Sequence, residues 1–171
     1  MDLPQTLSHA YLITGGSEQQ RQELARRMAA AYLCTGQPAP CGVCRPCRKV
    51  QGGIHPDVQW VTTLADKREI TVDQARTLRA DLYVTPNEGA RKVYIIDPAD
   101  ALNPAAQNAL LKSLEEGPAY GAFLLLAEQP GRLLETVGSR GETLSLPPQE
   151  DQPDPQQVGK AQAPAQLLVT G

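Results

Sequence analysis

Residues 92–118 read KVYIIDPADALNPAAQNALLKSLEEGP, and this stretch decides the fold class. Residues 93–96 are apolar and largely β-branched, and they end at Asp97, which is typical of a buried strand with a carboxylate at its C-terminal end. Asn103 and Pro104 suit the start of a helix, and apolar residues then recur at helical spacing. A strand that carries a carboxylate to the edge of a sheet and is followed by a helix occurs in many nucleotide-binding sites.

The rest of the chain repeats this alternation of short apolar runs and amphipathic segments. Strands are expected at 10–14, 57–62, 93–96, 122–127 and 143–146, and helices after Ser17, Thr71 and Asn103 and near 132–136. Several of these strands are apolar on both faces, and strands that alternate with helices form parallel sheets covered on both sides. The sequence therefore predicts an α/β fold, a three-layer αβα sandwich around a parallel five-stranded sheet.

The bulk properties limit the possible functions. A chain of 171 residues with 41% hydrophobic content supports one core of ordinary size, in which we expect Trp60 to pack. A net charge of −3 gives no overall positive field, so any contact with nucleic acid must be local or made through partners. The N-terminus has no basic leader pattern, and the longest apolar run, 122–127, is too short to span a membrane. We expect a cytoplasmic protein.

Four cysteines form the most specific motif in the chain. Cys34, Cys41, Cys44 and Cys47 follow the spacing C-x6-C-x2-C-x2-C, which allows four thiolates to converge on one tetrahedral site. Zn²⁺ is the metal that suits this ligand set, and four protein ligands leave no open position for a substrate, so the role is expected to be structural. The alternatives are reduced cysteines without a metal and an iron–sulfur cluster.

Three basic residues, Arg45, Arg48 and Lys49, lie beside these cysteines in the sequence. They can offset the negative charge of four thiolates, or they can contact the phosphates of a nucleic acid.

The segment after the first predicted strand, GGSEQQRQ at 15–22, departs from a phosphate-binding loop. Such a loop needs Gly-x4-Gly-Lys-Ser/Thr. Gly15 is present, but Gln20 replaces the second glycine, Arg21 replaces the lysine, and Gln22 has no hydroxyl to offer Mg²⁺. We therefore expect no nucleotide at Gly15, Arg21 and Gln22, although Arg21 could still meet an anion at the helix N-terminus.

The end of the central strand also lacks parts of a hydrolytic site. Asp97 stands where an acidic residue would orient Mg²⁺, but Pro98 follows where a carboxylate would orient the attacking water. Asp97 is then expected to be a remnant that caps nearby amides.

Residues 148–171 are rich in Pro and Gln, and we expect them to form a disordered tail.

Several motifs in combination resemble the N-terminal AAA+ module of bacterial clamp-loader subunits. They are HAYL at 9–12, the four cysteines, HPDV at 55–58, ITVDQ at 70–74, KVYIID at 92–97 and NALLKSLEE at 108–116. The resemblance implies an AAA+ P-loop-type domain over 1–147 with an inserted zinc module at 34–50, and a chain without the family's lid and collar domains. Gamma and tau subunits have an intact phosphate loop, whereas delta-prime subunits commonly have a degenerate one, so the delta-prime type matches better.

The resemblance also implies site residues and partners. Arg140 matches the arginine of the family's Ser-Arg-Cys motif, which acts in trans on ATP bound to a neighbouring subunit, while Gly141 departs from the motif. Cys34 is the least certain ligand, because the family usually has x8 rather than x6 in the first gap. The implied partners are the gamma/tau and delta subunits, with the sliding clamp and primed DNA reached through the complex.

The expected function is that of a non-catalytic subunit in DNA polymerase III, with structural Zn²⁺, no ATP and no activity of its own inside a DNA-directed DNA polymerase holoenzyme. Two alternatives remain open. One is a gamma/tau-like P-loop ATPase with a divergent loop, and the other is a free-standing, zinc-dependent nucleic-acid-binding module.

Overall fold

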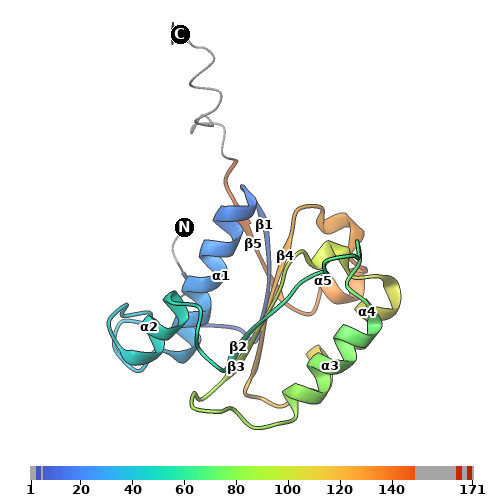
Figure 1. The fold of residues 1–171 in the computed structure, drawn as a ribbon, viewed down its shortest axis with the longest axis horizontal. Helices are drawn as coiled ribbons and strands as arrows, with labels where there is room; N and C mark the ends of the chain where they lie inside the picture. The colour runs from blue at the N-terminus through green and yellow to red at the C-terminus, as the bar shows by residue number, and fades with distance from the viewer. Residues whose placement is uncertain (1–2, 5, 149–164, 167–168, 171) are drawn as a thin grey trace.

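A five-stranded parallel sheet runs through the middle of the protein in the order β2-β3-β4-β1-β5 (Figure 1). The computed structural model describes residues 3–4, 6–148, 165–166 and 169–170. The strands of the sheet are β1 (Ala10–Gly15), β2 (Val58–Val61), β3 (Lys92–Ile96), β4 (Gly121–Ala127) and β5 (Glu142–Leu146). Because all five strands are parallel, their carboxyl ends share one edge of the sheet, where α/β proteins place their ligands.

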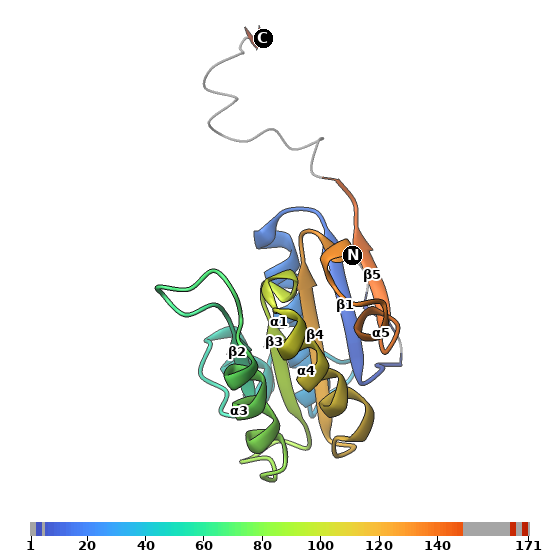
Figure 2. The same cartoon turned by 90° about the vertical axis from the view of Figure 1, so that its right-hand side faces the viewer.

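Helices cover both faces of this sheet, as Figures 1 and 2 show. One face packs against α1 (Glu18–Leu33) and α2 (Arg45–Gln51). The other face packs against α3 (Val72–Leu82), α4 (Pro104–Glu116) and α5 (Glu135–Gly138). Alternate residues of the central strands enter the two cores, so that Tyr94 lies in one and Ile95 in the other. The predicted three-layer αβα sandwich is confirmed.

The helices α1, α3 and α4 begin where the capping patterns predict, whereas α2 and α5 begin without a side-chain cap. Ser17 and Gln20 form a reciprocal capping box at α1, and Thr71 and Gln74 form another at α3. The Oδ1 atom of Asn103 accepts a hydrogen bond from Ala106 N at 2.8 Å and caps α4. These caps satisfy backbone amides that have no partner inside the helix, and their sequence signals are local, which is why the sequence revealed them.

Two expectations about the elements were wrong in detail. The predicted helix near 132–136 is replaced by a 3-10 turn at Pro130–Arg132 followed by α5, which begins only at Glu135. Trp60 does not pack in the core: it is 36% exposed, and the Arg26 guanidinium lies 5.4 Å from its ring centroid. Trp60 belongs to β2, an edge strand that α1 covers only in part, and a cation over its ring supplies the remaining contact.

The predicted tail lies mostly outside the described residues. Within 148–171 the described pairs form two short strands, β6 (Ala165–Gln166) and β7 (Val169–Thr170), which pair antiparallel. The expectation of a disordered tail stays a prediction.

In the described part of the chain, no helix combines the length and the apolar character needed to cross a membrane.

Candidate functional site

The loop after β1 lies at the edge of the sheet where a nucleotide would be expected. Gly15 and Gly16 turn the chain with φ of 79° and 60°, a conformation that glycine adopts without strain. Ser17 N then donates to Gln20 Oε1 at 2.8 Å, and Gln20 N donates to Ser17 Oγ at 3.1 Å. The capping box therefore uses amides of the first helical turn that an anion would otherwise approach.

Arg21 turns back onto this loop. Its Nη1 atom donates to the carbonyl oxygens of Gly15 and Gly16 at 3.0 and 3.1 Å, and the residue is only 6% exposed. Arg21 Nε is buried and has no hydrogen-bond partner among the described residues. The cation that stands in the lysine position is thus bound to backbone oxygens of its own loop.

Gln22, the next residue, contacts Asp97 at the carboxyl end of β3. Gln22 Nε2 donates a hydrogen bond of 2.7 Å to Asp97 Oδ2, and Asp97 is 6% exposed. The sequence predicted that Asp97 caps nearby amides, and the amide that it contacts belongs to the side chain of Gln22, 75 positions away in the sequence. A metal ion at Asp97 would have to displace this amide, so the substitution at position 22 also changes the environment at position 97.

Asp100 makes a link that the sequence did not reveal. Its two carboxylate oxygens accept hydrogen bonds from Glu128 N and Gln129 N at 3.4 and 3.3 Å. The carboxylate ties the segment after β3 to the segment after β4, and no sequence pattern marks a contact over such a separation.

The four cysteines come together between the end of α1 and the start of α2. Their sulfur atoms all lie within 4.8 Å of one another, and those of Cys34 and Cys44 are 3.9 Å apart. In a tetrahedral site with Zn–S bonds of about 2.3 Å, the sulfur atoms are roughly 3.8 Å apart. The residues therefore fit a four-thiolate metal site, and Cys34 joins the cluster despite the short x6 gap.

Backbone amides surround these sulfur atoms. Gly36 N and Cys41 N both donate to Cys34 Sγ at 3.3 Å, and Cys44 N donates to Cys41 Sγ at 3.2 Å. Backbone hydrogen bonds at Thr35 and Cys47 lower the pKa of Cys44 to about 5, while burial raises the pKa of Cys47 to about 12. The loop thus favours a thiolate at Cys44, whereas burial favours the neutral thiol at Cys47.

A polar network joins the segment that carries the cysteines to the loop at 87–89. Lys49 Nζ pairs with Glu88 Oε1 at 2.6 Å, and His55 Nδ1 accepts a hydrogen bond from Asp57 N at 3.0 Å. The carboxylate of Asp57, which is 1% exposed, accepts four hydrogen bonds of 2.6–3.1 Å from the loop at 87–89. Of the three basic residues near the cysteines, Lys49 therefore has a protein partner, and Arg45 and Arg48 are exposed.

Sequence reasoning missed the anchoring role of Asp57. The motif HPDV at 55–58 marked the region, but only the fold shows that the carboxylate binds a loop about 30 residues later in the chain.

Arg140 lies beyond α5, just before β5. Its Nε atom donates a hydrogen bond of 3.0 Å to Glu115 Oε2, its Nη2 atom lies 2.8 Å from the same oxygen in an ion pair, and its side chain is 42% exposed. The carboxylate belongs to the last turn of α4, so Arg140 is held by a neighbouring helix while part of its guanidinium faces outward.

The departure at Gly141 has a steric cause. A Cβ atom at position 141 would lie 2.7 Å from Ala10 O and 3.0 Å from Ala10 Cβ. The backbone of β1 is too close for a side chain at this point, so the glycine permits the pairing of β5 with β1.

Comparison with known proteins is consistent with this geometry. A family model described as DNA polymerase III, delta subunit, matches residues 4–150. The delta-prime subunit of DNA polymerase III from Pseudomonas aeruginosa is 41% identical over 135 residues, which cover 78% of this chain and 41% of that protein. The delta-prime subunit from Bacillus subtilis is 38% identical over 143 residues, which cover 83% of this chain and 43% of that protein.

A solved structure shares the fold. It is a gamma subunit-related protein of DNA polymerase III from Thermotoga maritima, with a TM-score of 0.59 and 22% identity, covering 83% of this chain and 42% of that one. The chain thus spans less than half the length of the relatives it matches. The family match covers most of the chain, and the two sequence relatives share one subunit type. The chain therefore belongs to the delta-prime family of DNA polymerase III clamp-loader subunits.

Proposed function

We propose that this chain is the AAA+ module of a non-catalytic clamp-loader subunit, which supports ATP-dependent loading of the sliding clamp onto primed DNA. The observation that carries the proposal is the closed loop after β1. Arg21 is bound to the loop's own carbonyl oxygens, and Gln22 is bound to Asp97. A nucleotide and its metal would have to break all of these contacts, so we expect no ATP at this site and no hydrolysis by this chain.

Arg140 is the residue that we assign to a neighbouring ATPase subunit. A guanidinium is planar and permanently charged, and when supplied in trans it stabilises the charge that develops on a transferred phosphoryl group. The exposure of Arg140 supports this role. In the assembled loader it would contact the phosphates of ATP bound to a gamma or tau subunit.

Zn²⁺ is the metal that we propose for the cysteine cluster. The convergence of the four sulfur atoms and the amides directed at them support the assignment. With four thiolates as ligands, the metal would have no open position and would hold together the irregular loop between α1 and α2.

The proposed partners are the gamma/tau and delta subunits in the cytoplasm, with the clamp and primed DNA reached through the complex. Because the chain spans less than half of its relatives, loading is assigned to the complex and not to this chain alone.

The test combines the chain with gamma/tau and delta subunits and measures co-purification and ATP hydrolysis. Arg140→Ala is expected to lower the stimulated rate by about tenfold or more, because an arginine supplied in trans contributes strongly to phosphoryl transfer. Arg132→Ala is the matched control, since Arg132 is also exposed and lies in the same connection. Equal rates for the Arg140 and Arg132 variants would contradict the trans role.

Two results with the chain alone would favour the other functions. Micromolar binding of Mg·ATP that is abolished by Asp97→Ala would indicate a P-loop ATPase. Salt-dependent DNA binding that is lost when Arg45 and Arg48 are replaced would indicate a nucleic-acid-binding module.

A further inference from the structure

We propose that Glu115 is a positioning residue for Arg140: it fixes the direction in which the guanidinium meets the phosphates of a neighbouring subunit. This inference rests on the proposed trans role of Arg140 and adds a second residue to it. Glu115 would touch neither nucleotide nor metal and would act only through the arginine.

The contact has the geometry of an orienting pair. Arg140 Nε donates a hydrogen bond of 3.0 Å to Glu115 Oε2, and Arg140 Nη2 lies 2.8 Å from the same oxygen in an ion pair. A charge-assisted hydrogen bond from Nε and a close contact of Nη2 with the same oxygen hold this edge of the guanidinium against Glu115. The Nη1 side has no hydrogen-bond partner among the described residues, and the side chain is 42% exposed. The guanidinium is therefore held on one edge and open on the other.

The helix that carries Glu115 also holds the connection that leads to Arg140. Gln107, which is 2% exposed, accepts a hydrogen bond from Leu134 N at its Oε1 atom and donates from Nε2 to Arg132 O at 3.3 Å. Gln107 and Glu115 lie two turns apart on α4, so side chains of one helix contact both ends of the segment 132–140.

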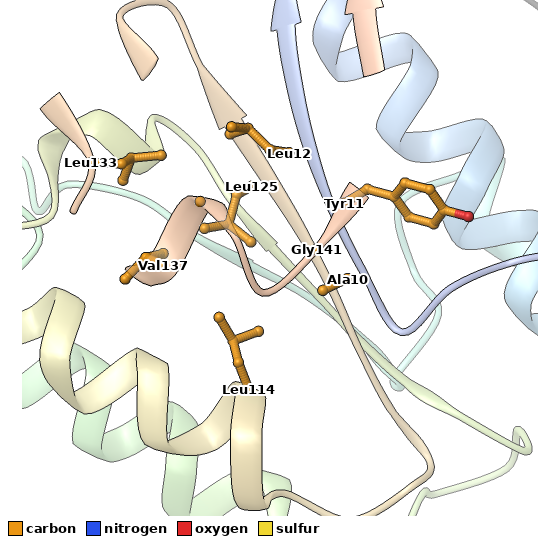
Figure 3. A pocket seen from close by; sticks show the side chains of 9 residues that line it. Ala10, Tyr11, Leu12, Leu114, Leu125, Leu133, Val137 and Gly141 are labelled. Atoms are coloured by element: carbon orange, nitrogen blue, oxygen red, sulfur yellow. The ribbon is translucent and has the colours of Figure 1, made fainter. Parts of the chain in front are cut away.

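Apolar side chains pack between the contacts made by Gln107 and those made by Glu115. Figure 3 shows Leu114 of α4, Val137 of α5 and Leu125 of β4 around a small pocket, while the ring of Tyr11 points to the opposite face of the sheet. The pocket holds only ≈ 10 Å³, so there is little room for α5 to shift. This packing therefore holds the backbone at Arg140 in place. The long side chain can still point in several directions, and the contact with Glu115 selects one of them.

Stability alone does not account for this pair. Both side chains are more than a third exposed, and ion pairs in that setting add little to the free energy of unfolding. A carboxylate beside the arginine also weakens its attraction for phosphate. An arginine that acts across a subunit boundary gains from orientation, because catalysis of phosphoryl transfer depends on accurate placement.

The experiment measures ATP hydrolysis by the complex of this chain with gamma/tau and delta subunits, with kcat and KM determined separately. Glu115→Ala is expected to lower kcat by roughly tenfold with little change in KM, since a misdirected group costs rate more than ground-state binding. Glu115→Gln should recover most of the loss, because its amide oxygen can still accept the hydrogen bond from Arg140 Nε. Glu116→Ala, which removes an equal charge from the adjacent exposed residue, should match the wild type.

A double variant separates positioning from independent effects. Glu115→Ala combined with Arg140→Ala should be no slower than Arg140→Ala alone, because Glu115 acts only through the arginine. The inference is overturned if the rate losses of the two single variants multiply in the double variant. It is also overturned if the complex with Glu115→Ala hydrolyses ATP as fast as the wild-type complex or faster, which is the result expected if the carboxylate only masks the arginine. If Arg140→Ala itself changes nothing, or the wild-type chain does not stimulate hydrolysis, the proposed trans role fails, and the inference fails with it.

Discussion

Gln22 and Asp97 are joined by a hydrogen bond of 2.7 Å from Nε2 to Oδ2, at the edge of the sheet where an ATPase would hold its magnesium ion. The amide supplies a donor to a carboxylate that would otherwise be free to bind a metal. Arg21 is bound to the carbonyl oxygens of Gly15 and Gly16. The side chains of Arg21 and Gln22 therefore both make contacts inside the protein at the place where a nucleotide would bind. We therefore base the proposal that this chain binds no nucleotide on these contacts as well as on the residues that a phosphate-binding loop would need.

This relationship predicts how the site could be reopened. Arg21→Lys combined with Gln22→Thr removes both internal contacts and restores a hydroxyl and an ammonium group. We expect the double variant to bind Mg·ATP at least about tenfold more tightly than the wild type, which corresponds to ~1.4 kcal/mol. Isothermal titration calorimetry measures the difference.

Gln19→Thr serves as the control for this change, because Gln19 is exposed on the same helical turn. Equal ATP affinity for the wild type and the double variant would show that Arg21 and Gln22 do not close the site.

The cysteine cluster predicts one bound zinc ion per chain. Elemental analysis of protein purified without chelator should give a metal-to-protein ratio near one, and Cys44→Ser should lower it markedly, because a hydroxyl is a poor substitute for a thiolate ligand. Removal of the metal should speed hydrogen exchange in 34–50 and leave β3 and β4 protected, since these strands belong to the main cores. A ratio near zero in the wild-type protein would contradict the site.

Asp57 predicts a dependence of stability on pH. Burial alone would raise the pKa of this carboxyl, but hydrogen bonds from the amides of Glu88, Asn87 and Gly89 hold the pKa below its usual value. The carboxylate therefore stabilises the folded protein above the unfolded pKa of about 3.9, and this contribution disappears as the pH falls through the lower folded pKa. Asp57→Asn should lower the free energy of unfolding by about 2 kcal/mol at pH 7 and by progressively less below pH ~4.

Urea denaturation at several pH values measures this effect. Asp66→Asn is the comparison, because Asp66 is exposed and has no hydrogen bond to the described part of the chain. A loss at Asp57 that does not change with pH would mean that the charge of the carboxylate is unimportant.

Gly141 and Gly138 predict opposite responses to the same substitution. Gly141→Ala should lower the free energy of unfolding by about 1–3 kcal/mol, because its new methyl group would lie 2.7 Å from Ala10 O. Gly138→Ala places its methyl group where no atom lies within 4 Å, and it should be neutral or stabilise by up to about 1 kcal/mol. Denaturant unfolding of the two variants under one condition tests the pair, and similar losses for both would contradict the steric explanation.

Local signals explain which predictions succeeded. The capping boxes at Ser17 and Thr71 and the cap at Asn103 involve residues only three positions apart, so their patterns are visible in the sequence. The strands could be located for the same reason, since the apolar runs at 93–96 and 122–127 are contiguous. The prediction that Trp60 packs in the core was wrong. An aromatic side chain suits a strand whether the strand is central or, as here, at the edge of the sheet, so the residue type does not reveal the burial.

By itself the sequence determined the fold class and the positions of the five strands along the chain, and its motifs supplied the residues that we propose for the site. The helix α2 was not predicted, because its N-cap residue, Cys44, makes no side-chain hydrogen bond that would mark the start. Only the tertiary structure decided how the proposed site residues are used. The bond from Gln22 to Asp97, the hold of Glu115 on Arg140 and the entry of Cys34 into the cluster each depend on how separate elements pack. Such contacts follow from the order of strands in the sheet and the placement of helices on its faces, and no local pattern encodes them.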